Sequence, residues 1–331
     1  MWQNLQGHDT IVDRFRRAFA RGRLAGSFLF VGPPGVGKRR FAFALALALL
    51  CKKNAGLNPC GECDSCKLFG HTRCTDFDFE SAFHSPHPDM YYVTSPPGKD
   101  TLPMELLVGD DKNRGRAGLC YDISRTPFLG HRKVAIINDA DLLKAEGANA
   151  LLKTLEEPPP DAVMILIGTS TAKQLPTIRS RCQIVRFAPL APAILSAILV
   201  EKGIAPSVKQ ADHWAAQAEG SLDQAKELAD SDMDTMRKEM LQCLTNPHWD
   251  AVAISRKMND LVQASAKDLS QKRRQTRLLF GLTVEQFRDE AKSGDAHRAV
   301  RRLERTLDAL EQVDRNVNVS LIIESWAMDL S

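Results

Sequence analysis

The sequence lacks a long hydrophobic run. Its most apolar stretch, residues Phe41 to Cys51, is about half as long as a helix that crosses a membrane, so we expect a buried helix there and no membrane span. The N-terminus, Met1 to His8, has neither the basic start nor the apolar core of a signal peptide. We therefore expect a cytoplasmic protein that makes no contact with a membrane.

A strong charge of one sign is also missing. The chain has 44 basic and 41 acidic residues, which gives a formal net charge of +3. This mild excess permits contact with nucleic acid without requiring it, and we interpret the basic runs at 272–274 and 301–302 as solvated faces. With 331 residues and 44% hydrophobic content, the chain is long enough for about two to three domains with ordinary cores.

Short apolar runs alternate with helical patterns over the first part of the chain. Runs of this kind at 27–31, 134–137 and 163–167 are typical of strands buried on both faces of a parallel sheet that is flanked by helices. The strand patterns stop after Pro189, and only amphipathic helical segments follow. We therefore expect an α/β domain at 1–190, a small helical lid at 191–231 and an all-helical domain at 232–331.

The segment from Phe69 to Tyr121 gives the weakest pattern. It contains proline and glycine breakers and the charge run at 110–116. We expect part of this segment to be loop and the charge run to be solvated.

A glycine-rich loop follows the first predicted strand. The sequence Gly32-Pro33-Pro34-Gly35-Val36-Gly37-Lys38 fits the first seven positions of the motif G-x-x-x-x-G-K-[ST] and precedes a helical pattern. Such a loop turns backbone N–H groups inward around phosphate, and its lysine reaches the outer phosphates. Gly32, Gly35, Gly37 and Lys38 are therefore predicted to bind nucleotide. The alternative is a turn before a helix that binds nothing.

The residues that should handle magnesium are altered. The eighth motif position should be a hydroxyl residue that coordinates Mg²⁺, but it is Arg39. After the run at 134–137, an active ATPase would have Asp and then Glu, whereas this chain has Asn138 and Asp139. Both changes affect residues that take part in ATP hydrolysis, so we predict that ATP turnover is slow or absent. Lys38 and the glycines still permit ATP to bind, with weakened magnesium binding.

Further motifs follow the altered acidic pair. Residues 139–143 read DADLL, residues 147–159 read GANALLKTLEEPP, Thr169 ends the predicted strand at 163–167, and Ser180-Arg181-Cys182 comes later. Together these closely resemble the bacterial clamp-loader ATPases, a family of the AAA+ class. The resemblance implies an AAA+ P-loop fold in which Thr169 stands at the first sensor position. It also implies that Arg181 acts on ATP held by a neighbouring subunit, as an arginine finger. The alternative is a surface arginine in an ion pair.

The predicted lid departs from the family's motifs at one more position. Gly220-Ser221-Leu222 resembles the start of the family's second sensor motif, where the active gamma ATPase has an arginine next, but this chain has Asp223. These losses, with Arg181 retained, are the pattern expected of the delta-prime type. The resemblance implies a hetero-pentamer with gamma/tau and delta subunits that loads a sliding clamp onto primed DNA. Residues 316–324 resemble the family's last segment, so the third domain would be a collar. Two alternatives are an active gamma/tau-type ATPase and a zinc-containing module that binds nucleic acid.

Half of the eight cysteines are clustered. Cys51 is followed by Cys60-x-x-Cys63-x-x-Cys66, and in a reducing compartment such a cluster more often holds a metal than forms disulfides. Four thiolates would close a structural Zn²⁺ site with no open position for catalysis, and the cluster resembles the zinc module of clamp-loader subunits. An iron–sulfur cluster and scattered buried cysteines are the alternatives. His71 and Cys74 compete with Cys51 as the fourth ligand.

Overall fold

The computed structural model divides the chain into two compact units, Met1–Lys226 and Glu227–Ser331. It describes residues 2, 5–53, 57–70, 87–96, 101–229, 240, 242, 250–265, 269–293, 296–314 and 317–330. The predicted boundary near residue 231 lies outside the described residues. Among those residues, the helices are too short or too polar to cross a membrane.

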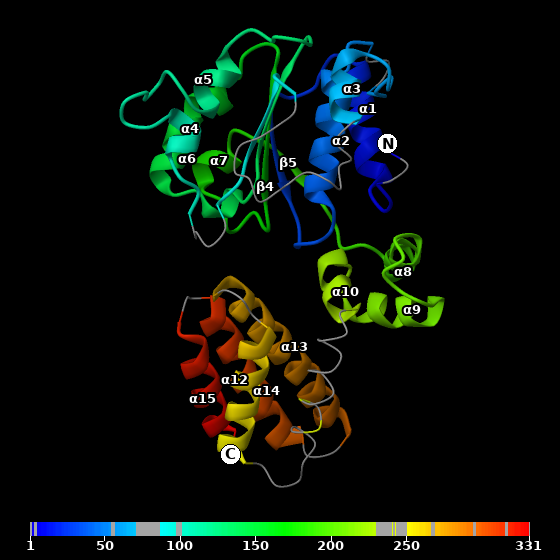
Figure 1. Cartoon of the computed structure of the whole chain (residues 1–331), viewed down its shortest axis with the longest axis vertical. Helices are drawn as coiled ribbons and strands as arrows, with labels where there is room; N and C mark the ends of the chain where they lie inside the picture. Colours follow the sequence, from blue (N-terminus) through cyan, green and yellow to red (C-terminus); the bar gives the residue numbers. More distant parts are fainter. Residues whose placement is uncertain are drawn as a thin grey trace. The chain divides into compact units, whose positions relative to one another are not determined.

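A parallel sheet forms the centre of the first unit (Figure 1). Its five strands lie in the order β2-β3-β4-β1-β5, and each neighbouring pair is parallel. This confirms the predicted α/β fold with a parallel sheet. The strands are β1 (Ser27–Val31), β2 (Met90–Val93), β3 (Lys133–Ile137), β4 (Ala162–Gly168) and β5 (Gln183–Arg186).

Helices cover both faces of the sheet, and the two-residue period of the strands decides which side chains they meet. Phe28 and Phe30 of β1 belong to one core, together with side chains of α1 and α2. Leu29 and Val31 point into the other core, with side chains of α4, α5, α6 and α7. The helices are α1 (Asp9–Ala20), α2 (Lys38–Leu50), α4 (Glu105–Val108), α5 (Leu119–Ser124), α6 (Ala145–Glu156) and α7 (Pro176–Arg179).

Residues 191–226 of the predicted lid belong to the first unit, and residues 191–229 form three short helices. They are α8 (Pro192–Glu201), α9 (Val208–Gln217) and α10 (Leu222–Ala229). The Ser207 hydroxyl begins α9 by accepting a hydrogen bond from the Gln210 N–H, an N-cap. A one-turn 3₁₀ helix, η2 (Ala140–Leu142), and α3 (Asp64–Gly70) are the remaining helices of this unit among the described residues.

The segment that gave the weakest sequence pattern contains regular structure as well as loop. Strand β2 and helix α4 fall between residues 69 and 121, and α5 begins there at Leu119. The charge run at 110–116 is exposed and folded into turns, as predicted. The sequence missed β2 because its four residues are too few to show a period.

A buried carboxylate joins the starts of two strands. Asp89, just before β2, is 0% exposed. Its side chain accepts hydrogen bonds from the N–H groups of Phe128, Leu129 and Gly130, at 2.5, 2.7 and 2.9 Å. These three residues lead into β3. These three donors give the buried side chain the hydrogen bonds that it cannot obtain from water.

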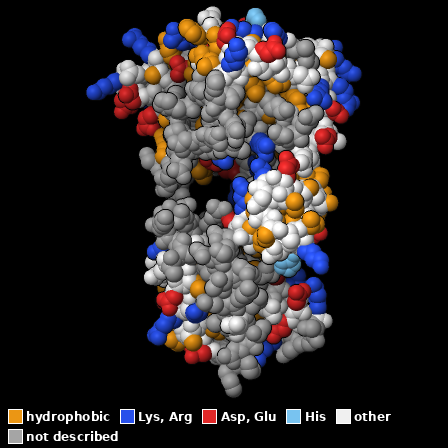
Figure 2. Space-filling view, turned by 45° about the vertical axis from the view of Figure 1, so that its right-hand side comes forward, with side chains coloured by type: hydrophobic (Ala, Val, Ile, Leu, Met, Phe, Trp, Pro, Cys, Tyr) orange, Lys and Arg blue, Asp and Glu red, His pale blue; other side chains and the backbone are white. Residues whose placement is uncertain are grey.

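Every element described in the second unit is helical, as the sequence predicted for residues 232–331. Its core contains Phe280, Phe287 and Trp326, and Trp326 donates a hydrogen bond from Nε1 to the Thr306 hydroxyl at 3.0 Å. On the face drawn in Figure 2, acidic and basic side chains are intermixed, as expected from the small net charge. The helices are α12 (Ala251–Ser265), α13 (Leu269–Ser293), α14 (Ala296–Asp314) and α15 (Val319–Asp329).

Candidate functional site

The predicted nucleotide residues lie at the carboxyl edge of the sheet. The glycine-rich loop follows β1, Asn138 and Asp139 follow β3, and Thr169 follows β4. Since all five strands are parallel, these strand ends share one edge, which is where open α/β sheets bind ligands. The Gly32 N–H donates to the Thr169 carbonyl at 3.2 Å and thereby joins the loop to β4.

The side chain of Lys38 is turned back onto its own loop. Lys38 is the first residue of α2, is 7% exposed, and donates from Nζ to the carbonyls of Gly32 and Pro33, both at 2.6 Å. Burial lowers the pKa of Lys38 to about 8, and the charges of Asp141 and Asp223 oppose that shift. The ammonium group therefore has two carbonyl partners within its own loop.

Arg39 reaches toward strand β2. Burial raises the pKa of the Tyr92 phenol, and the neighbouring Arg39 guanidinium opposes that shift. Beside them, the Thr94 hydroxyl donates to Asp139 at 2.7 Å, and the Asn138 amide donates to the Thr94 hydroxyl at 3.3 Å. The altered residues of the two motifs thus lie close together and are held by side chains of β2 and the residues after it.

Thr169 is engaged by a carboxylate. Asp141, from η2, accepts hydrogen bonds from the Thr169 N–H at 2.8 Å and from its hydroxyl at 2.5 Å. The Gln174 amide donates to the other oxygen of the same carboxylate. Asp141 therefore fixes the end of β4 next to the glycine-rich loop.

The donor set at this edge does not fit magnesium, which prefers oxygen ligands. The motif position that should bring a hydroxyl brings the guanidinium of Arg39, a group that only donates hydrogen bonds. Asn138 offers an amide in place of a carboxylate, and the carboxylates of Asp139 and Asp141 are already bound to Thr94 and Thr169. The pocket keeps the backbone shape of a phosphate site without the ligands for its metal.

Arg181 lies outside this pocket's hydrogen bonds and makes an ion pair. Its Nε lies 3.2 Å from a Glu156 carboxylate oxygen, and its side chain is 29% exposed. A further bond runs from its guanidinium to the Thr177 carbonyl at 3.2 Å. In the single chain Arg181 is thus held at the surface between the end of α6 and α7.

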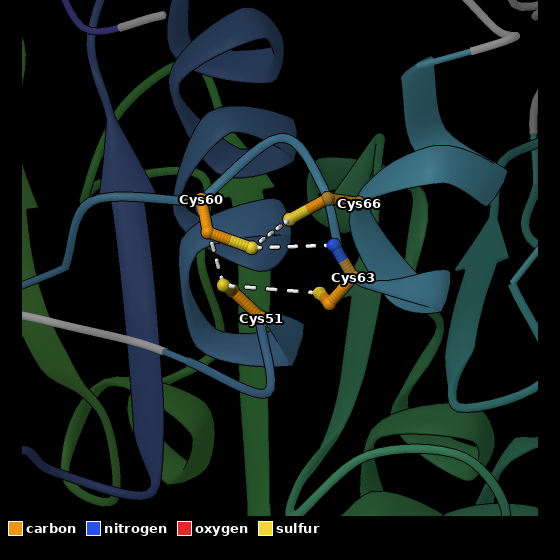
Figure 3. A group of neighbouring side chains, drawn as sticks. All are labelled: Cys51, Cys60, Cys63 and Cys66. Carbon is orange, nitrogen blue, oxygen red and sulfur yellow. Dashed lines mark hydrogen bonds between the residues drawn. The ribbon is translucent and has the colours of Figure 1, made fainter.

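The four predicted cysteine ligands do come together (Figure 3). The Sγ atoms of Cys51, Cys60, Cys63 and Cys66 all lie within 4.8 Å of one another. Cys51 directly follows α2, Cys63 directly precedes α3, and Cys66 lies in the first turn of α3. Gly61 turns the chain between them with a φ of +75°, which suits glycine.

The cluster has the chemistry of a metal site. The N–H groups of Glu62 and Cys63 donate to the Cys60 sulfur at 3.5 and 3.3 Å, and they lower the pKa of Cys60 to about 6. A thiolate is the form that binds metal, so these donors favour it. Four sulfur donors at this spacing could hold a metal ion. The competing ligands His71 and Cys74 lie outside the described residues.

Three residues of the pocket were not predicted from sequence: Thr94, Asp141 and Gln174. Thr94 could have been found from the short apolar run that precedes it, had this run been recognised as a strand. Asp141 stands two residues after the altered acidic pair, within the quoted family motif, but its bond to Thr169 spans 28 residues. Nothing in the local sequence indicates that pairing.

Comparison with known proteins places the α/β part of the chain in a family. The model of the family described as "DNA polymerase III, delta subunit" matches residues 7–191, more than half of the chain. DNA polymerase III subunit delta' of Pseudomonas aeruginosa is 36% identical over 162 residues, which are 49% of this chain and 43% of that protein. The same subunit of Bacillus subtilis is 33% identical over 186 residues, 56% of this chain and 49% of that protein. The chain thus spans about half the length of the curated relatives it matches.

A solved structure resembles the chain over most of its length. A DNA polymerase III gamma subunit-related protein from Thermotoga maritima covers 96% of this chain and 97% of its own, with 16% identity and a TM-score of 0.47.

Proposed function

This chain belongs to the DNA polymerase III delta subunit family, and from that membership we propose that it is a clamp-loader subunit of the delta-prime type. In this role it assembles with gamma/tau and delta subunits and helps them load a sliding clamp onto primed DNA in the cytoplasm. The delta' names of its relatives support the choice of type. Residues 1–190 would be an AAA+ domain, 191–231 its lid and 232–331 a collar.

The observation that carries the proposal is the altered donor set around the phosphate loop, together with the retained Arg181. Arg39, Asn138 and Asp223 stand where an ATPase needs a hydroxyl, a carboxylate and an arginine. In this proposal a subunit with these residues does not hydrolyse ATP itself but supplies an arginine to the ATP site of a neighbouring subunit. Arg181 is exposed enough to do so, and its guanidinium suits the charge that develops in phosphoryl transfer.

The ion pair with Glu156 is compatible with this role. Such a pair at the surface contributes about 1 kcal/mol or less, so a neighbour's phosphates can displace it. Stronger charge-assisted hydrogen bonds to phosphate would replace it. In this proposal Glu156 holds the guanidinium until the subunits assemble.

Cys51, Cys60, Cys63 and Cys66 would hold a structural Zn²⁺ ion. When bound, the ion would supply a cross-link between the end of α2 and α3. The chain's own contribution is to bring the four sulfur atoms together and to favour the thiolate at Cys60.

The test is a reconstitution of the loader with Arg181→Ala in this subunit. We expect ATP turnover at the neighbouring site to fall by about 10³-fold, the usual contribution of an arginine finger. Arg179→Ala is the matched control, because Arg179 is an exposed arginine two residues away on the same turn. Gel filtration confirms that both variants assemble. Unchanged turnover in an assembled Arg181→Ala loader would refute the role of Arg181, and failure of the native chain to assemble would refute the proposed subunit type.

A further inference from the structure

The loop that brings Cys60 to the cysteine cluster is held from outside the cluster by Trp2. The Trp2 indole N–H donates to the Leu57 carbonyl at 2.7 Å, and this hydrogen bond is buried. The Trp2 side chain is buried and packs against Phe41 of α2, with 5.5 Å between the ring centroids. Trp2 therefore ties Leu57 to the helix that leads to Cys51.

Leu57 has a backbone conformation that leucine rarely adopts. Its φ is +61°, in the left-handed region, where the Cβ atom of an L-residue is crowded by the following carbonyl. Its side chain is 0% exposed and belongs to the same core as Trp2 and Phe41. A residue other than glycine keeps this conformation only where the surrounding contacts hold it. The indole hydrogen bond is one of these contacts.

A short span of chain joins this turn to the cluster. Leu57 and Cys60 are three residues apart, a distance of about 10 Å at most, so a shift of Leu57 is carried to Cys60. The Cys60 N–H donates to the Cys51 sulfur at 3.3 Å, which joins two of the four ligands (Figure 3). Between them, Asn58 accepts a hydrogen bond from the Arg16 guanidinium of α1 at 3.3 Å.

The ion pairs near the cluster hold the loop less firmly. Lys52 lies 3.0 Å from an Asp64 carboxylate oxygen, and Lys53 lies 3.2 Å from a Glu62 carboxylate oxygen. Both carboxylate side chains are mostly exposed, so water and salt screen these pairs. Losing a buried hydrogen bond costs more, because the acceptor cannot turn to water instead.

We propose that Trp2 is a positioning residue for the cysteine cluster. By holding Leu57 in its left-handed turn, it keeps the Cys60 sulfur beside the Cys51 sulfur, so that the four thiols are gathered before a metal ion arrives. The chain then binds Zn²⁺ more tightly than it would without the indole N–H, because less of the binding free energy is spent on ordering the loop. This inference rests on the proposed metal site.

The test is a measurement of Zn²⁺ affinity of the full chain, by competition with a chromophoric chelator at constant pH. Trp2→Phe keeps an aromatic ring beside Phe41 and removes the indole N–H, and we expect it to weaken Zn²⁺ binding about tenfold. Trp326→Phe is the matched control. It removes a buried indole N–H that donates to Thr306 in the second unit, and it should leave the affinity unchanged. Circular dichroism should confirm that both variants are folded.

A second measurement uses the native chain alone. If Trp2 favours metal binding, then bound metal must favour the docked Trp2 by the same factor, because coupling between two sites is reciprocal. With the tryptophan indole nitrogens labelled for NMR, we expect the Trp2 indole proton to exchange with solvent about tenfold faster after a chelator removes Zn²⁺. The Trp326 indole proton should exchange at the same rate with and without Zn²⁺.

The outcomes separate this inference from the metal site on which it rests. Equal Zn²⁺ affinity of the native chain and folded Trp2→Phe would overturn the role of Trp2, since a residue that only stabilises the fold would give this result. An equal loss in Trp326→Phe would also overturn it, and so would Trp2 proton exchange that does not respond to the chelator. A native chain that binds no Zn²⁺ would overturn the metal site together with this inference.

Discussion

The cysteine cluster and the phosphate-loop pocket are built in opposite ways. The cluster takes all four ligands from residues 51–66, and its donor set is complete. The pocket draws on the motif at 32–39, on residues after three further strands and on the start of α10, and it is altered at Arg39, Asn138 and Asp223. A site whose ligands all come from one short segment can be recognised from the sequence. A site assembled from distant segments can keep its best-known motif and still change its chemistry.

The largest expected effect is on the cluster. Cys63→Ser removes one of four thiolates, and since structural zinc contributes on the order of 10 kcal/mol to folding in zinc-finger peptides, we expect several kcal/mol of stability to be lost. Metal analysis by mass spectrometry should show the ion in the native chain and its loss in the variant. Calorimetry should show the lower stability. Cys120→Ser is the control, because Cys120 lies in α5 outside the cluster. Metal retained by the folded Cys63→Ser chain would show that the cluster is not the site.

A matched pair of glycines compares the two regions directly. Gly35 and Gly61 have similar positive φ values, +73° and +75°. Replacing either of them with alanine therefore costs about 1 kcal/mol of backbone strain. Nothing lies within 4 Å of a Cβ atom at Gly61, whereas at Gly35 it would collide with Ser221 and Asp223. We expect Gly35→Ala to lower the free energy of unfolding by about 2 kcal/mol more than Gly61→Ala does. Equal losses in urea unfolding would mean that the lid does not rest on the loop.

A smaller expected effect is a change of stability with pH that is caused by Lys38. Burial lowers the pKa of Lys38 from 10.5 to about 8, so above pH 8 the folded chain releases a proton that the unfolded chain keeps. Because the unfolded state then binds more protons, the stability that Lys38 confers rises with pH between these two values. From pH 7.5 to 9 we expect native stability to gain about 1 kcal/mol relative to Lys38→Met.

Urea unfolding at the two pH values measures that gain. Lys173→Met, which changes an exposed lysine, is the control and should show no such gain. If the native chain and Lys38→Met differed in stability by the same amount at both pH values, the Lys38 ammonium would not be destabilised by burial.

Much of the fold could be predicted because its strands are continuous apolar runs. The runs at 27–31, 134–137 and 163–167 became β1, β3 and β4 with ends shifted by at most one residue. The motif at 147–159 lies largely in α6, which begins at Ala145 and buries the small residues Gly147 and Ala148. Strand β2 was missed, since four residues between two poorly patterned segments give no usable period.

The site could be predicted where ligands are neighbours in sequence. The four cysteines and the glycine-rich loop were found in this way, and the structure gathers each group. The bonds of Asp141 to Thr169 and of Asp139 to Thr94 span 28 and 45 residues, and only the order of the strands brings them together. The bonds from Lys38 to the carbonyls of Gly32 and Pro33 could not be deduced from the motif.

The buried Asp89 carboxylate has a practical consequence for protein engineering. By binding the N–H groups of residues 128–130, it fastens the start of β2 to the start of β3. The connection between these strands is thereby anchored at its base, and lengthening a loop adds little entropic cost to closing it. A peptide tag or fluorophore inserted in the exposed turn at 110–116 should therefore leave the sheet undisturbed. That turn is a natural place to label the chain for single-molecule observation of the proposed assembly.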